Sequence, residues 1–422
     1  MPKPGYKLAN WYFGKYEEIP EEWSMNLMKD LCKVRQGLQI PISERFNESG
    51  PNRSTYITVK AVHSGKFEEF IENPGKRVVC TKDDILFTRT GNTGEIITNI
   101  EGVFHNNFFL VDFDRKILSK NYLIYFLKQG KIQGFIRGLA GSTTIPDLNH
   151  DDFFRLLMPV PPIEEQKKIA SILNTVDNLI AKYDSIIDST KLLKQGLMQT
   201  LLTKGIGHKK FKKIKWLFGK EIEIPDEWEM RLLSDLSQVV DSRHFTPKYT
   251  EKGIPLILPN NVTQSGLDFS NTKFTTKDDY AELIAGNRKP EKNDIIYTRN
   301  ASFGVANQVV DNTLFSLGQD LVLIKPTVIE PYLLFRILNS EIILQQLTSL
   351  VSGSTFKRIN LEFIRSFLIP TSNKQKEQQK IASILSNVDS KISELESKKS
   401  HIEKIKKGLM QKLLTGQIRI RV

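Results

Sequence analysis

The sequence predicts an α+β protein that is built twice, with two mixed α/β domains, two long antiparallel coiled-coil helices and a pseudo-twofold internal repeat. Three observations support this prediction. The segment QKKIASILNTVD (166–177) returns as QQKIASILSNVD (378–389) with three differences. Strand-like runs that end in Gly, Pro or small residues occur before each copy. After each domain, apolar residues recur at every seventh position, as they do in coiled coils.

The composition is that of a folded globular protein with a basic charge balance. The chain has 422 residues, 40% of them apolar, and 60 Lys and Arg against 48 Asp and Glu give a net charge of +12. This charge favours a polyanionic partner such as nucleic acid, although an ordinary basic protein is the alternative. Two cysteines without CxxC spacing support neither a disulfide framework nor a zinc site. Without an apolar run of about 18 residues or a signal-peptide core, we expect a cytoplasmic protein with no membrane partner.

The repeat extends over most of the chain. WYFGKYEEIPEEW (11–23) matches WLFGKEIEIPDEW (216–228), and DDILFTRTGNTG (83–94) matches NDIIYTRNASFG (293–304). In the second pair, a β-prone run leads into a Thr-Arg pair and a turn, which is typical of a strand that ends in a loop. Between the two pairs of matching segments, the halves share little beyond a strand-like pattern. The sequence therefore predicts a common framework around a divergent region.

Prolines and helix patterns divide the chain into four segments. In each half a Gly-Ser-Thr loop precedes an apolar-Pro exit, and prolines of this kind end a sheet and open a helix. The predicted segments are a first domain (1–160), a first long helix (161–205), a linker with the second domain (206–370) and a second long helix (371–422). Within the domains, Tyr122–Leu127 and Tyr332–Ile337 are expected to begin a helix.

The first long helix is predicted to have a regular seam. Its two series are Ile169, Val176, Tyr183, Thr190 and Leu197, and then Ile172, Leu179, Ile186 and Leu193 three positions further on. The second helix keeps the first series at Ile381, Val388, Leu395, Ile402 and Leu409, whereas Leu385 and Ile392 shift the rest of its stripe by one position. Helices of about 40 residues would each be roughly 60 Å long at ~1.5 Å per residue.

Chain connectivity fixes the direction of the two helices. If they pack together they must be antiparallel, and the chain end then lies close to the N-terminal segment. Gly205 and Gly416 follow the two helical patterns, where a left-handed cap is expected.

The sequence contains no recognisable catalytic motif. It lacks the phosphate loop GxxxxGK[ST], a GxGxxG after a strand, the zinc motif HExxH and the [DN]PPY tetrapeptide of amino-methyltransferases. Its six histidines do not recur at equivalent places in the two halves. We therefore expect a chain without an active site of its own.

Candidate DNA-contacting residues lie in the repeated loops and in the divergent region. Arg89 and Arg299 of the Thr-Arg pairs can each donate two hydrogen bonds to a guanine edge or a phosphate, although an arginine that fixes a loop carboxylate is an equal alternative. Asparagine amides suit adenine, and small-residue loops offer backbone amides to phosphates. The other candidates are Asn92, Thr93, Ser142, Thr143, Arg243, Asn260, Asn261, Asn300, Ser354 and Lys357. The basic run 208–215 is either an electrostatic contact or a solvated linker.

Taken together, the motifs resemble the DNA-specificity (S) subunits of type I restriction-modification systems. The features that carry the resemblance are Ile-Pro-x-Glu-Trp at 19–23 and 224–228, Gly-Ser-Thr before an apolar-Pro exit, PPIEEQKKI at 161–169, and GLMQ followed by LLT at 196–203 and 408–415. The resemblance covers essentially the whole chain. One departure is SNKQKEQQ at 372–379, which replaces the Pro-Pro entry in the second half.

This resemblance implies two target recognition domains, each of which reads one half of a bipartite, asymmetric site in double-stranded DNA. The helices would set the gap between the half-sites and dock two methyltransferase (M) subunits, and restriction (R) subunits would join through the M complex. Adenine methylation with S-adenosylmethionine, and DNA cleavage with ATP and Mg, would reside in those partners, so no cofactor is expected here. The alternatives are a coiled-coil interaction scaffold with incidental DNA affinity and a stand-alone restriction or modification enzyme, which the missing motifs oppose.

Overall fold

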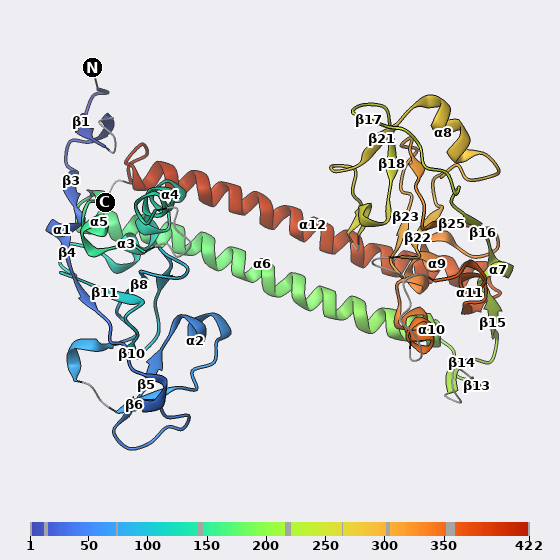
Figure 1. Cartoon of the computed structure of the whole chain (residues 1–422), viewed down its shortest axis with the longest axis horizontal. Helices are drawn as coiled ribbons and strands as arrows, with labels where there is room; N and C mark the ends of the chain where they lie inside the picture. Colours follow the sequence, from blue (N-terminus) through green and yellow to red (C-terminus); the bar gives the residue numbers. More distant parts are fainter. Residues whose placement is uncertain are drawn as a thin grey trace. The chain divides into compact units, whose positions relative to one another are not determined.

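The chain folds into two compact units, seen here in a computed structural model. The structure describes residues 2–11, 16–72, 75–141, 147–215, 221–263, 265–300, 304–351 and 359–420. Unit 1 comprises Met1–Asp184 and Lys398–Val422, and unit 2 comprises Ser185–Ser397. Two long helices, α6 (Ile163–Lys204) and α12 (Gln375–Leu414), each begin in one unit and end in the other (Figure 1). Among the described residues, no helix is long and apolar enough to cross a membrane.

Unit 1 contains two four-stranded sheets, a hairpin and a strand pair. Its strands are β1 (Tyr6–Asn10), β2 (Tyr16–Pro20), β3 (Ser24–Leu27), β4 (Cys32–Gln36), β5 (Arg53–Ile57), β6 (Phe70–Glu72), β7 (Val79–Cys80), β8 (Leu86–Thr88), β9 (Ile96–Ile97), β10 (Gly102–Phe104), β11 (Phe108–Phe113) and β12 (Leu157–Val160). Its shorter helices are α1 (Met28–Leu31), α2 (Val59–Ser64), α3 (Lys120–Leu127), α4 (Gly130–Leu139) and α5 (His150–Phe154), with 3-10 turns at Ile42–Glu44 and Lys76–Val78. The sheet orders are β4-β11-β8-β9 and β6-β5-β10-β7, and β3 pairs with β12.

Unit 2 also contains two four-stranded sheets, with three two-stranded pairs beside them. Its strands are β13 (Phe211–Lys215), β14 (Glu221–Pro225), β15 (Trp228–Leu232), β16 (Ser237–Asp241), β17 (Tyr249–Thr250), β18 (Ile254–Ile257), β19 (Val262–Thr263), β20 (Gly266–Leu267), β21 (Lys273–Thr275), β22 (Ile295–Thr298), β23 (Ala306–Gln308), β24 (Ser316–Leu317), β25 (Leu321–Pro326) and β26 (Leu368–Ser372). Its helices are α7 (Leu233–Leu236), α8 (Lys277–Ile284), α9 (Pro331–Leu338), α10 (Glu341–Val351) and α11 (Leu361–Arg365), with a 3-10 turn at Pro259–Asn261. The sheet orders are β16-β25-β22-β23 and β17-β21-β18-β24.

The first sheet is the same in both units and the second is not. β4-β11-β8-β9 and β16-β25-β22-β23 place equivalent strands in the same order, with antiparallel neighbours throughout. Each second sheet contains one parallel pair, β5 with β10 and β18 with β24. However, β7 extends the sheet beyond β10, whereas β24 has no strand beyond it in the described sheet. The divergent region of the sequence therefore corresponds to the second sheet.

The start of each long helix belongs to a domain core. In unit 1, Ile169 and Leu173 of α6 pack in one cluster with the buried face of the first sheet and with α3, α4 and α5. Phe87, Phe109 and Phe153 lie within this cluster, with ring centroids 5.0 to 5.3 Å apart. In unit 2, the equivalent cluster contains the start of α12. The best repeated stretch of the sequence is therefore an anchor in both domains, and its burial explains its similarity.

The buried stripe of α6 differs from the predicted seam. The predicted second series is exposed, with Ile172 at 37%, Leu179 at 42%, Ile186 at 49% and Leu193 at 56%. Instead, the buried residues lie four after members of the first series, namely Leu173, Ile187 and Leu201, and Ile180 at the same spacing is half-buried. Seven-residue spacing places both i+3 and i+4 beside the first series, and the packing in these units selects i+4. On α12, Leu385 and Ile392 are buried, so the shift predicted for that helix is confirmed.

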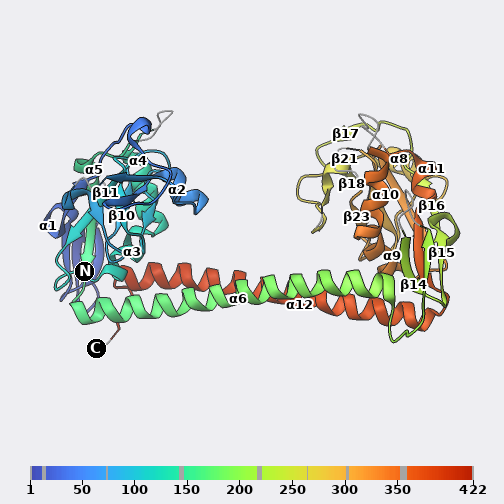
Figure 2. The same ribbon diagram turned by 90° about the horizontal axis from the view of Figure 1, so that it is seen from below.

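The long helices run antiparallel within each unit, as predicted. In unit 1 the first half of α6 lies beside the second half of α12, which Figures 1 and 2 both show. Asp177 of α6 and Lys406 of α12 form an ion pair at 2.5 Å there. Unit 2 repeats this pair with the helices exchanged, because Asp389 of α12 binds Lys194 of α6 at 2.6 Å. The same carboxylates accept the hydroxyls of Tyr125 and Tyr332, which come from the domain helices α3 and α9.

Both helices end on the left-handed glycine that the sequence predicts. Gly205 has φ +64° and Gly416 has φ +72°. A Cβ atom on Gly416 would lie 2.4 Å from Pro20, and one on Gly205 would lie 2.8 Å from Trp228. Glycine is thus required both by the backbone and by the close approach. Tyr6 donates a hydrogen bond to the carbonyl of Gly416 at 2.9 Å, which confirms that the chain end lies beside the N-terminal segment.

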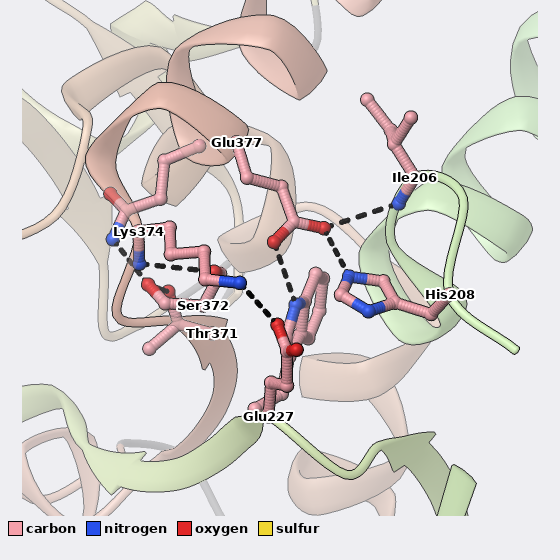
Figure 3. A network of polar contacts seen from close by, with 9 residues as sticks. Ile206, His208, Glu227, Thr371, Ser372, Lys374 and Glu377 are labelled. Carbon is pink, nitrogen blue, oxygen red and sulfur yellow. Dashed lines mark hydrogen bonds and ion pairs between the residues drawn. The ribbon is translucent and has the colours of Figure 1, made fainter. Parts of the chain in front are cut away.

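In each domain a glutamate that is at least partly buried joins the two long helices. In unit 2, Glu377 in the first turn of α12 accepts hydrogen bonds from Trp228 Nε1 at 3.2 Å and from the backbone N–H of Ile206 at 3.2 Å (Figure 3). His208 Nε2 lies 2.7 Å from the same carboxylate. Ile206 and His208 directly follow the end of α6, so that one carboxylate holds the start of one helix, the end of the other and the domain entry. The helix N-terminus also favours a negative charge there.

Unit 1 has the same junction with one substitution. Glu165 in the first turn of α6 is 1% exposed and accepts from Trp23 Nε1 at 3.0 Å. Arg419, which follows the end of α12, binds this carboxylate at 3.0 Å, in the role that His208 has in unit 2. The tryptophan of the Ile-Pro-x-Glu-Trp motif therefore donates a hydrogen bond to the junction glutamate in both units, which explains why this residue of the motif recurs.

The glutamine that follows each buried glutamate fixes a domain helix. Gln166 accepts from the backbone N–H of Ser119, the residue before α3, at 2.8 Å. Gln378 accepts in the same way from Glu330, the residue before α9, also at 2.8 Å. Both side-chain amides also donate to backbone carbonyls of the strand exit. The Glu-Gln pair thus satisfies buried backbone groups that would otherwise cost free energy.

We predict that Glu377→Gln destabilises unit 2 in a pH-dependent manner. Burial acts to raise the pKa of Glu377, but the hydrogen bonds that its carboxylate accepts outweigh burial and hold this pKa below 4.5. The ionised form therefore stabilises the fold above about pH 4.5, and this contribution is lost as the pH falls through the lowered pKa. We expect the variant to lose about 2 kcal/mol of unfolding free energy at neutral pH, with a smaller difference below about pH 4. Calorimetric unfolding of the full chain measures both.

Glu394→Gln is the matched control on the same helix. Glu394 is exposed and pairs with Lys391 at 3.1 Å, so its loss should change the unfolding free energy by less than about 0.5 kcal/mol. Equal unfolding curves for Glu377→Gln and the control at neutral pH would contradict the role of the buried carboxylate.

Candidate nucleic-acid interface

The arginine of each repeated Thr-Arg pair is bound to a carboxylate of its own unit. Arg89 makes two hydrogen bonds with Asp147, Nε to Oδ1 at 2.7 Å and Nη2 to Oδ2 at 2.9 Å. Its hydrogen bond to Asp147 raises the pKa of the guanidinium. The backbone carbonyl of Arg89 also accepts from the N–H of Leu148 at 3.1 Å. Arg89 therefore fixes the segment that follows residues 142–146.

Arg299 repeats the backbone contact in unit 2, but its carboxylate partner comes from a strand. Its Nη1 lies 2.6 Å from Oδ1 of Asp241, the last residue of β16, and its Nε donates to the carbonyl of Ile359 at 2.9 Å. The carbonyl of Arg299 accepts from the N–H of Ile359, as that of Arg89 does from Leu148. Arg299 is 6% exposed. The structure thus favours the alternative of a fixed loop carboxylate for Arg89 and holds Arg299 inside unit 2, and a contact of either with DNA stays a prediction.

An asparagine cap continues this arrangement in both units. Asn149 accepts from the N–H of Asp152 at 2.7 Å and begins α5, and Asn360 accepts from Phe363 at 3.0 Å and begins α11. Such caps supply an acceptor to the unpaired amides of a first helical turn. The chain leaving each Gly-Ser-Thr segment is therefore held first by an arginine and then by a helix cap.

Asn92 and Thr93 lie in the loop that joins β8 to β9. The exposed Asn92 amide is 3.1 Å from His63 Nε2, and His63 is 2.8 Å from Glu95. Thr93 donates to the carbonyl of Arg89 at 3.0 Å. This loop and the end of α2 thus form an exposed polar cluster, with an amide and an imidazole on one surface of unit 1.

In unit 2 the structure brings Asn260 and Asn300 together at a hollow of about 350 Å³. Asn260 follows β18, and Asn300 follows β22 with its Nδ2 3.3 Å from Asp320 Oδ2. Gln319 and Asp320 at the β24–β25 turn also line the hollow, as does Tyr249 of β17. The hollow therefore combines planar amides, a carboxylate and an aromatic ring.

Two further candidates in unit 2 make internal contacts. Asn261 is buried, its Oδ1 accepts from the N–H of Leu258 at 3.0 Å, and its Nδ2 donates to Asn271. Arg243 pairs with Glu282 of α8 at 2.6 Å, although both side chains are 45% exposed. Asn261 thus holds the turn that presents Asn260, whereas Arg243 keeps surface exposure.

The remaining candidates have different outcomes. Ser142, Thr143, Ser354 and Lys357 lie outside the described residues. Residues 211–215 of the basic run form strand β13, which pairs with β14. Lys212 of this strand donates to the carbonyl of Asp226 at 2.8 Å. The first residue of the run, His208, is the partner of Glu377. Part of the run therefore contributes to the unit 2 junction.

Sequence reasoning missed Tyr249, Gln319 and Asp320 at the hollow. Asp320 adopts φ +67°, a left-handed conformation that is uncommon outside glycine. The segment LGQDL between two β-prone runs carried a signal for this tight turn. It gave no indication that Asn260 and Tyr249 would lie beside it, because that proximity arises from strand pairing.

The described residues contain no cluster of three or more metal-ligating side chains. Both cysteines are buried, and burial raises the pKa of each thiol to about 12. Thiols with such a pKa are protonated near neutral pH and are poor nucleophiles.

Comparison with known proteins places the chain. Residues 20–188 and 225–405 match the family model described as type I restriction modification DNA specificity domain. The MjaVIII specificity subunit of Methanocaldococcus jannaschii is 28% identical over 414 residues, covering 96% of this chain and 94% of that protein. The putative MjaX specificity subunit of the same organism is 28% identical over 436 residues, covering 99% and 98%.

Solved structures agree in fold. The type I S subunit from M. genitalium superimposes with a TM-score of 0.56 at 16% identity and covers 93% of this chain and 96% of its own. A chain from a structure of type I complex assembly superimposes with a TM-score of 0.58 at 16% identity, covering 95% and 100%. The two matches to the family model together span most of the sequence, and the chain belongs to the DNA specificity (S) subunits of type I restriction-modification systems.

Proposed function

We propose that this subunit directs a type I complex to a bipartite, asymmetric duplex site, with each unit reading one half-site. The observation that carries the proposal is that the two units share a framework and differ in the second sheet. We take this sheet and the residues around it as the DNA-reading surface. The first sheet, the backbone contacts of the two arginines and the glutamate junctions are equivalent in both. The second sheet and the residues around it differ, and two different surfaces suit two different half-sites. The net charge of +12 suits the phosphate contacts that supply much of the DNA affinity.

In this proposal the subunit itself is not an enzyme. Adenine methylation with S-adenosylmethionine, and translocation and cleavage with ATP and Mg, belong to the M and R subunits. The chain contributes the choice of sequence, through side chains that contact base edges in the grooves. Asn92, Thr93, Arg243, Asn260 and Asn300 are the described candidates with access to such contacts.

The long helices would set the gap between the half-sites and dock the M subunits. The outer stripe of α6, defined as Ile172, Leu179, Ile186 and Leu193, is exposed and apolar. Lys391 and Lys398 stand at positions of α12 that correspond to Leu179 and Ile186 by the internal repeat. Exposed apolar residues at regular helical spacing mark a protein contact rather than a DNA contact. The outer stripe therefore supports the docking of a partner protein.

We predict that exchanging residues 24–160 for those of a relative with another target changes one half-site and preserves the other. The exchange carries β3 and β12 together, so their antiparallel pairing is kept. Mapping methylated adenines in a host genome, with the complete complex expressed, measures the result. The control is an exchange of the equivalent segment 229–371, which should change only the other half-site. An unchanged target after both exchanges would exclude this chain as the reader of sequence.

We predict that Leu179→Asp with Ile186→Asp weakens M-subunit binding at least tenfold and leaves the DNA preference intact. Charges on the outer stripe cannot be buried in an apolar interface without a large cost. Co-purification and sedimentation measure binding to the M subunits, and competition between duplexes measures preference.

Asn178→Asp with Ser185→Asp is the control for these substitutions. Both residues are exposed and each directly precedes a residue of the outer stripe, so the charge is equal but lies on another face of α6. If both double variants lose the M subunits equally, charge rather than the apolar stripe is responsible, and the docking proposal fails.

We predict that Arg89→Ala and Asp147→Ala weaken DNA binding to the same extent, within about threefold of each other. Each removes the same two hydrogen bonds and releases the same segment, if Arg89 acts by fixing its carboxylate. Titration of the full chain with labelled duplex at several salt concentrations gives both affinities. A loss specific to Arg89→Ala, with a shallower salt slope, would instead indicate a phosphate contact of the guanidinium itself.

A further inference from the structure

Among the described residues, the chain takes a different path in unit 1 at the place that corresponds to the hollow of unit 2. In unit 1 the segment after β4 lies directly on β10, where Leu38 donates its N–H to the carbonyl of Phe104 at 3.0 Å. Gly37 is so close to this strand that a Cβ atom would lie 2.2 Å from the carbonyl oxygen of His105. Backbone therefore fills this place in unit 1.

In unit 2 the equivalent segment follows another path. Arg243, the counterpart of Leu38 by its distance from the end of the strand, pairs with Glu282 of α8 instead. Phe245 and Thr246 then line the hollow together with Gly318 and Gln319, and Gln319 donates to the Thr246 hydroxyl at 3.2 Å. Unit 2 thus has an open space that unit 1 closes with its own chain.

The walls of the hollow are of two kinds. Tyr249, Phe245 and Pro259 present flat apolar faces, whereas Asn260, Asn300 and Asp320 present amide and carboxylate groups. A volume of about 350 Å³ is at the lower end of sites for small organic groups. Planar ligands with polar edges fit such walls, because their faces stack on rings and their edges bond to amides.

One cation lies beside the lining of the hollow. The ammonium of Lys273 lies over the Tyr249 ring, 4.0 Å from its centroid. This contact holds a cation over one face of the ring, and a phosphate attached to a bound planar group would benefit from it. Neutral planar ligands without a phosphate would not use this charge.

We propose that the hollow receives one nucleobase that has turned out of the DNA duplex. The base would stack on Tyr249, its edge would meet the Asn260 and Asn300 amides, and Asp320 would accept from an exocyclic amino group. Amides and carboxylates recognise base edges in this way, and flipped bases are held by stacking and edge contacts in closed pockets. This inference rests on the proposed recognition of a half-site by unit 2.

Affinity for duplexes with one unpaired base tests the inference. The duplexes carry the half-site assigned to unit 2, and each has a single mismatched position, so that the cost of unstacking that base is already met. We expect at least tenfold tighter binding by the full chain at one position of this half-site. The same series in the half-site assigned to unit 1 should show no gain.

Asn260 is exposed, so a tryptophan at this position can fill the hollow. Asn260→Trp should therefore abolish the gain in affinity for the mismatched duplex. It should leave the affinity for the paired half-site of unit 1 unchanged. Its matched control is Lys60→Trp, since Lys60 is exposed and follows β5 as Asn260 follows β18. Thermal unfolding of both variants verifies that they fold. Asn260→Ala, which removes only the amide, should reduce the gain at least threefold.

Three outcomes would overturn the inference, and they differ in what else they affect. Sequence-specific binding to paired duplex with no gain at any mismatch excludes the extrahelical base and leaves the proposed function intact. Absence of any sequence preference in the wild-type chain would overturn both. A gain that persists in Asn260→Trp would place the unpaired base elsewhere.

Discussion

The structure depends on a carboxylate at the start of each long helix, buried in unit 1 and partly buried in unit 2. Glu165 and Glu377 each receive a tryptophan from the domain entry and a backbone N–H from the residues that follow the other helix. A buried charge is tolerated only when it is well bonded, so these ligands are obligatory and must stay together. This single requirement couples the domain entry, the start of one helix and the end of the other. It also explains why the tryptophans and the helix-end glycines recur while much of each domain has changed.

Because of this coupling, the second sheet of each unit can change in sequence more freely than the first sheet and the helix anchors. The first sheet and the helix anchors share one core in each unit, so a substitution there disturbs all of its elements. The second sheets have smaller clusters of their own. Their strands can be lost, added or rearranged without touching the buried glutamates. Under the proposed function, a subunit with this division can acquire a new reading surface while it keeps the surfaces that dock its partners.

The sequence predicted the features that repeat and missed those that depend on distant pairing. The duplicated domains, the antiparallel helices, the glycine caps and the shifted stripe of α12 follow from local patterns. The prediction for α6 was wrong at its second series. Seven-residue spacing alone does not distinguish residues at i+3 from residues at i+4, and the packing of the helix determines which of them are buried. The partner of Arg89 lies 58 residues away, and no local pattern indicates Asp147. The hollow was missed for the same reason, since strands far apart in sequence form it.

A residue that recurs in both halves is more typical of the shared framework than of DNA recognition. Arg89 and Arg299 became candidates because they occur twice, yet a residue that reads an asymmetric target has no reason to recur in both halves. Their contacts agree with this argument, since each fixes the chain that follows a loop. Asn260, in contrast, lies in the divergent region and is exposed, and its counterpart in unit 1 is Lys60. An amide and an ammonium at equivalent positions would favour different bases or phosphates. The differences between equivalent positions therefore guide the search for sequence-reading residues better than the similarities do.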